Sequence, residues 1–143
     1  MLEFPFSELI SPEEQVTVAR CVAIMASRDS QVSASERHFV EELMGKMMLL
    51  PAERDRVRKE FANPTSLVEV SKGVRNREVR IFLFYQAVCA AMADSQLEEN
   101  ERNALVNLAK VFEFDVQAAR RFIRWVQDSL ELRDRGQQLV MEL

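Results

Sequence analysis

Two long apolar segments dominate this sequence and limit what the chain can fold into. Residues 16–26 contain only two polar side chains, Thr17 and Arg20, and residues 81–93 are interrupted only by Gln86. A helix that is apolar on nearly every face has to be buried, and both segments are shorter than the roughly 20 residues that span a bilayer. The two segments are therefore predicted to be core helices of a globular protein.

These apolar segments belong to a unit that occurs twice, at a constant offset of 65 residues. Asp-Ser-Gln-Val at residues 29–32 matches Asp-Ser-Gln-Leu at residues 94–97, and a Glu-Arg pair follows at the same distance in both copies. Neither copy can bury its apolar helix alone, so we predict a pseudo-twofold bundle with the two buried helices at its centre. The amphipathic positions that follow the two turns also coincide: Phe39, Val40, Leu43, Met44 and Met47 in the first copy, and Ala104, Leu105, Leu108, Ala109 and Phe112 in the second.

Several helix starts and stops can be located in the sequence. Ser11 and Ser33 each have a glutamate three positions later, which is the spacing of a capping box. Pro51 opens a charged helix that is predicted to be solvated, and Asp115 caps a long last helix. Gly136 is expected to break that last helix before its end.

The sequence thus predicts an all-α fold, a helical bundle of about seven helices with an internal pseudo-twofold repeat. We expect one domain over residues 1–143, with repeat halves at about 11–62 and 76–130. Only three glycines and four prolines interrupt the chain, which agrees with long helices and argues against a fold rich in β-turns.

Composition narrows the possible partners and the cellular location. The formal net charge is −4, whereas proteins that bind nucleic acid usually carry a basic excess, so nucleic acid and anionic membranes are disfavoured as partners. No signal peptide is recognisable at the start, so a cytoplasmic location is expected. In that compartment, Cys21 and Cys89 are expected to be buried free thiols, the alternative being one disulfide between the two central helices.

The repeated turn carries a more specific pattern. Ala-Ile-Met-Ala at residues 23–26 leads to Asp29 and Glu36, and Ala-Ala-Met-Ala at residues 90–93 leads to Asp94 and Glu101. A helix rich in Ala and Met, an Asp-containing turn and a Glu seven positions after the Asp resemble the tellurite-resistance TerB-like family, over about residues 14–130. The family turn usually reads Asp-Gly, whereas serine follows both aspartates here. Because serine does not freely adopt positive φ, the turns are expected to differ in shape from the family turn.

The resemblance implies a bacterial cytosolic protein of the stress response, without enzymatic activity, which binds a divalent cation through its acidic turns and docks to a protein partner. If the pseudo-twofold brings the turns together, Asp29, Glu36, Asp94 and Glu101 could face one space and bind Ca²⁺, Mg²⁺ or Mn²⁺ through carboxylate oxygens. The alternative is a protein-binding scaffold, similar to a co-chaperone, in which these acids only cap helices. Capping is the commoner role for acids at such positions.

Other chemistries find little support in the sequence. His38 is the only histidine, so no zinc constellation and no catalytic triad can be identified, and His38 is predicted to be a surface residue. An enzyme is therefore not expected. A basic stretch is a candidate docking surface for an acidic protein partner, three methionines are predicted to be core, and the oligomeric state is open between monomer and homodimer. The basic stretch is Lys72, Arg75, Arg77 and Arg80, and the methionines are Met44, Met47 and Met48.

Overall fold

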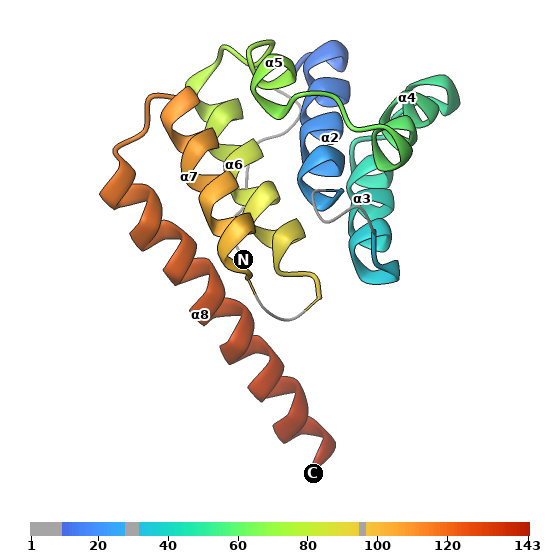
Figure 1. The fold of residues 1–143 in the computed structure, drawn as a ribbon. Coiled ribbons are helices and arrows are strands. Elements are labelled where there is room, and N and C mark those ends of the chain that lie inside the picture. The colour runs from blue at the N-terminus through green and yellow to red at the C-terminus, as the bar shows by residue number, and fades with distance from the viewer. Residues whose placement is uncertain (1–9, 28–31, 95–96) are drawn as a thin grey trace.

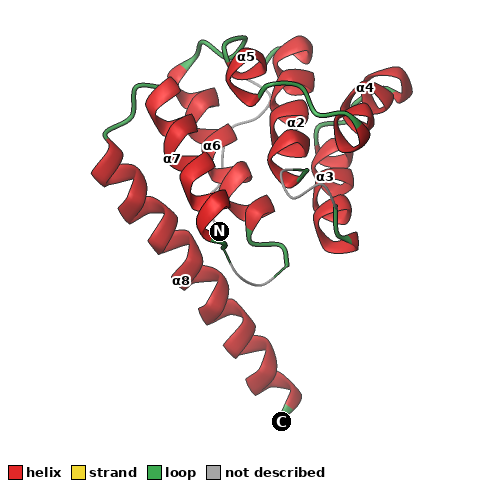
Figure 2. Ribbon diagram, in the orientation of Figure 1, coloured by secondary structure: helices red, strands yellow, loops and turns green. Residues whose placement is uncertain are grey.

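The structure is a computed structural model that describes residues 10–27, 32–94 and 97–143. Within these residues the chain forms seven helices and no strand, as Figures 1 and 2 show, so the predicted all-α bundle of about seven helices is confirmed. No helix among them is long and apolar enough to cross a membrane. The helices are α2 (Pro12–Ala26), α3 (Ala34–Lys46), α4 (Pro51–Ala62), α5 (Leu67–Ser71), α6 (Arg77–Ala91), α7 (Glu99–Val111) and α8 (Val116–Met141).

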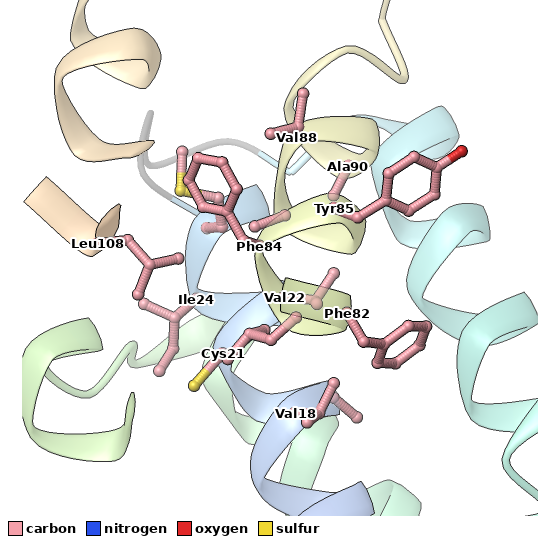
Figure 3. Close-up of a cluster of buried hydrophobic side chains, with 14 of the residues drawn as sticks. Val18, Cys21, Val22, Ile24, Phe82, Phe84, Tyr85, Val88, Ala90 and Leu108 are labelled. Carbon is pink, nitrogen blue, oxygen red and sulfur yellow. The ribbon is translucent and has the colours of Figure 1, made fainter. Parts of the chain in front are cut away.

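Helices α2 and α6 are the centre of the core. They pack against each other, while α3, α4 and α5 contact α2, and α7 and α8 contact α6 (Figure 1). In the cluster of Figure 3, Val18 and Val22 of α2 and Phe82 of α6 are almost completely buried. The two apolar segments are thus core helices, as predicted, because each supplies the apolar surface that the other needs to leave water.

The helix bounds keep the 65-residue spacing of the sequence repeat. Helix α6 begins and ends 65 residues after α2, and both have 15 residues, while α7 begins and ends 65 residues after α3, and both have 13. A superposition of the two halves about a pseudo-twofold axis stays a prediction.

Four helices begin with the same device. In α2, α3, α4 and α7, the glutamate at the third helical position accepts a hydrogen bond from the backbone N–H of the capping residue. At Ser11 and Ser33 the serine hydroxyl accepts the reciprocal bond from the glutamate N–H, which completes the predicted capping boxes. These bonds satisfy backbone donors that have no partner within the helix.

Helices α3 and α7 also end in the same way. Met48 and Glu113 follow them with φ angles of 57° and 60°, the left-handed conformation that favours glycine. The N–H of the next residue, Leu49 or Phe114, donates to a carbonyl five positions earlier, at 3.2 Å and 2.9 Å respectively. These bonds form a Schellman motif at each helix end, with a non-glycine residue in its strained position.

Two local predictions are wrong. Met48 is not core, because its place in the Schellman motif turns the side chain outward and leaves it 82% exposed, while Met44 and Met47 are buried as predicted. Gly136 does not break the last helix, since α8 continues through it to Met141. A single glycine lowers helix stability without removing a backbone donor, so it does not interrupt the helix as proline would.

The last helix is only half covered. Its buried side chains, Ala119, Ile123 and Val126, all lie in the first half, and every residue from 131 onward is exposed. Figure 1 shows this second half extending beyond the other helices.

Replacing Met48 or Glu113 with glycine is expected to raise the free energy of unfolding by about 0.5–1 kcal/mol for each, because glycine adopts positive φ without steric cost. The matched control is Lys46→Gly, which places glycine in the regular last turn of α3 and should lower stability by about 1 kcal/mol. Urea unfolding with an unchanged m-value measures both effects. Equal destabilisation of all three variants would contradict strain at Met48 and Glu113.

Candidate functional site

The acidic turns meet where α6 ends and α3 begins. Ser33 caps α3, and its hydroxyl donates a hydrogen bond of 2.6 Å to Oδ1 of Asp94, 61 residues away in the sequence. The same hydroxyl accepts the Glu36 N–H at 3.0 Å, and the Ser33 N–H donates to Oε1 of Glu36 at 3.1 Å. One serine therefore holds two of the predicted site carboxylates beside each other.

The two carboxylates differ in exposure. Asp94 is exposed, whereas Glu36 is 8% exposed and lies among the residues of the first turn of α3. Burial raises the pKa of the Glu36 carboxyl above its ordinary value, the hydrogen bonds from Ser33 lower it, and the neighbouring Asp94 carboxylate raises it again. The site thus holds two carboxyl groups side by side, and the ionised form of Glu36 is disfavoured.

The other two predicted residues are placed differently. Glu101 is buried in the first turn of α7, and its Oε1 accepts a 3.1 Å hydrogen bond from the Glu98 N–H. Asp29 lies outside the described residues.

Within the described ranges, no three or more histidine, cysteine, aspartate or glutamate side chains gather as a metal centre would require. The structure therefore brings together two of the four proposed ligands, Glu36 and Asp94, with the Ser33 hydroxyl between them. The arrangement of four carboxylates around one space stays a prediction.

The remaining reactive residues have structural surroundings. His38 is exposed and contacts Glu42 at 3.1 Å one turn later, so its prediction as a surface residue is confirmed. Cys21 and Cys89 are free thiols, and burial raises their pKa to about 12 and about 11. Thiols with such pKa values are protonated at neutral pH and are poor nucleophiles.

Part of the predicted basic surface belongs to the fold. The Arg80 guanidinium donates to the Val74 carbonyl at 2.8 Å and lies over the Phe112 ring at 5.2 Å. Lys72 pairs with Glu69 in the same short helical segment. Arg75 and Arg77 are exposed. Because Arg80 and Lys72 are engaged within the chain, the basic surface available to a partner is smaller than the sequence indicates.

Sequence reasoning missed the burial of Glu60. This residue was expected on the solvated face of the charged helix, yet it is 4% exposed. Its Oε1 accepts from the Thr65 hydroxyl at 2.7 Å, and Oε2 lies 3.5 Å from an Arg20 nitrogen of α2. Arg20 offered a signal, because a cation inside a buried segment needs an acid from another element.

A comparison with protein families identifies the family of the chain. Residues 15–124 match the family described as Tellurite resistance protein TerB. This chain belongs to the TerB family. The match takes in both acidic turns and the first part of α8, so the second half of α8 lies outside the TerB region. Neither the curated proteins nor the solved structures compared with the chain include a significant match.

In this TerB chain, Asp94→Asn is expected to lower the Glu36 pKa toward its ordinary value of 4.5, because the change removes the adjacent negative charge. Carboxyl chemical shifts followed through a pH titration by NMR measure it. Asp115→Asn, at the distant cap of α8, is the control and should leave the Glu36 pKa unchanged.

The raised pKa also fixes a pH dependence of stability. Between 4.5 and the raised value, the folded state binds more protons at Glu36 than the unfolded state does. The contribution of Glu36 to the free energy of unfolding therefore grows as pH falls through this window and is smallest at neutral pH. An Asp94→Asn protein should show a weaker dependence, and an equal one would contradict the assignment.

Proposed function

We propose that this TerB chain is a non-enzymatic interaction module of the stress response, including tellurite resistance, and that its acidic turns bind a divalent cation. The observation that carries the cation proposal is the meeting of Glu36 and Asp94 from separate halves of the chain, joined through Ser33. The family match supports the setting in tellurite resistance, and the resemblance stated above implies the wider stress response and a cytoplasmic location.

The charge of the pair supports a cation rather than another ligand. Two carboxylates side by side repel each other, and a divalent cation relieves that repulsion without requiring Glu36 to hold a proton. Carboxylate and hydroxyl oxygens are hard ligands that suit Ca²⁺, Mg²⁺ or Mn²⁺, with water completing the coordination. Two carboxylates are a small ligand set, so we expect weak binding, in the range of extracellular-type calcium sites rather than of tight buffers.

A cation at this position would have a structural effect. Asp94 follows the end of α6 and Glu36 lies in the first turn of α3, so a bound ion would tie a central helix of one half to an outer helix of the other. Such a tie would tighten the surface that the turns present to a protein partner. We propose this as the way in which cation binding and partner docking are linked.

The second candidate is a protein-binding scaffold without a cation, in which the acids only cap helices. One observation favours it: Glu14 and Glu53 occupy the same capping position as Glu36 and Glu101, in helices whose starts lie away from the repeated turns. Capping alone therefore accounts for a glutamate at each site. It does not account for Asp94, which caps no helix among the described residues.

Titration with Ca²⁺, Mg²⁺ or Mn²⁺, followed by amide NMR, separates the two functions. We expect shift changes, or line broadening with paramagnetic Mn²⁺, to be confined to amides near Ser33, Glu36 and Asp94 and near the other turn. The double variant Asp29→Asn with Asp94→Asn should abolish them, because it removes the aspartate of each copy while leaving both Glu caps intact.

The matched control is Asp115→Asn, which removes an aspartate that caps a helix away from the turns. This variant should respond to cations as the natural chain does. No change at millimolar cation would overturn cation binding and leave the scaffold as the function. Equal changes in the double variant would show that the ions bind elsewhere.

A further inference from the structure

The uncovered part of α8 carries an apolar stripe. Trp125, Leu132 and Leu139 are 47%, 66% and 60% exposed and are spaced seven residues apart, which places them on one side of the helix. Small residues, Ser129 and Gly136, alternate with them along the same side. The stripe begins beside Phe122, whose ring stacks on that of Trp125 with centroids 6.1 Å apart.

Gly136 has no explanation within the chain itself. A Cβ atom built there would meet nothing within 4 Å, and the residue lies inside a regular helix, where glycine is among the least favourable residues. Glycine in a helix is useful where a bulky group has to approach the backbone closely. The exposed position therefore leaves room for a large side chain of another helix to approach the backbone at Gly136.

A row of charges runs beside the stripe. Arg121, Asp128, Arg135 and Glu142 are also seven residues apart, and their signs alternate. All four are exposed, and none of them forms an ion pair with another residue of the described ranges. In the reverse direction along the helix, the row has the opposite sign at every position. Two copies of the row in antiparallel orientation would therefore bring opposite charges together.

We propose that α8 pairs with α8 of a second copy of this chain, in antiparallel orientation. In the register centred between residues 130 and 131, Trp125 packs on Gly136 of the second copy, Ser129 on its Leu132, and Phe122 on its Leu139. Each central layer joins a large side chain to a small one, which lets the helices approach closely. The same register places Asp128 beside Arg135 of the second copy and Arg121 beside its Glu142.

The bundle offers a place for the end of the second helix. A hollow of about 440 Å³ lies between α6 and α8, beside the stripe, and its walls include Ile81, Phe84, Phe114, Ala118 and Phe122. In the proposed register, Leu139 of the second copy reaches Phe122 at this hollow. The exposed half of each α8 would thus cover the apolar groove of the other molecule.

Charge favours a second copy over a foreign helix and the antiparallel over the parallel orientation. The antiparallel pair makes four attractive contacts, two of each kind related by the twofold axis. In a parallel pair, residues at these positions face those five places later, so Asp128 would meet Arg133 but Arg121 would meet Val126 and Arg135 would meet Val140.

Sedimentation velocity on the full chain, from micromolar to millimolar concentration, tests the proposal. We expect a reversible dimer. Asp128→Arg should weaken it by about tenfold, since two attractive contacts become repulsive. Arg135→Asp should weaken it similarly, and the double variant Asp128→Arg with Arg135→Asp should restore the natural affinity. Gly136→Leu should abolish the dimer by filling the space opposite Trp125.

The control is Asp134→Arg, which makes the same charge change on another side of the exposed helix and should leave the dimer unaffected. All substituted positions lie in or beside the uncovered half of α8, so far-UV circular dichroism and the melting temperature of the bundle should change little. The proposal is overturned if the natural chain stays monomeric at millimolar concentration. It is also overturned if Arg133→Asp, rather than Arg135→Asp, rescues Asp128→Arg, or if neither charge change alters the dimer.

Discussion

The packing of α2 against α6 is the constraint on which the rest of the structure depends. Each helix is apolar on too many sides for any outer helix to cover alone, so the two bury each other and the remaining helices cover what is left. This packing also fixes the positions of the chain segments that leave the two helices. Asp94 follows the end of α6 and meets Ser33 at the start of α3 because the central pair sets the distance between them.

The candidate site is a product of helix capping. Ser33 and Glu36 satisfy the backbone donors at the start of α3, and that requirement alone places a carboxylate in the first turn. Asp94 joins this cap from the other half of the chain and changes its chemistry, because a second negative charge now lies beside the buried Glu36 carboxylate. A common local motif thus becomes an electrostatically unfavourable pair, which a proton or a cation can relieve.

The two halves of α8 have different surroundings. Up to Leu130 the helix is held by apolar side chains that face α6 and α7, in the manner of any helix of the bundle. Beyond Leu130, every residue of the helix is exposed. This part of α8 lies outside the TerB region, and it carries large apolar side chains at regular spacing. Exposed apolar groups at helical spacing are typical of a surface that another helix covers.

The sequence by itself determined which segments are helical, where three of them are capped, which two are buried and which family the chain belongs to. Those properties depend on neighbours three or four positions apart and on a repeated motif, and both can be read without knowing the fold. The tertiary structure alone decided that Ser33 joins Glu36 to Asp94, that Glu60 is buried against Arg20, and that Met48 faces solvent. It also decided that α8 continues through Gly136 and that its second half extends beyond the bundle, where no other helix covers it in the described part of the chain. These outcomes depend on which surfaces distant segments present to one another, and no local pattern specifies that.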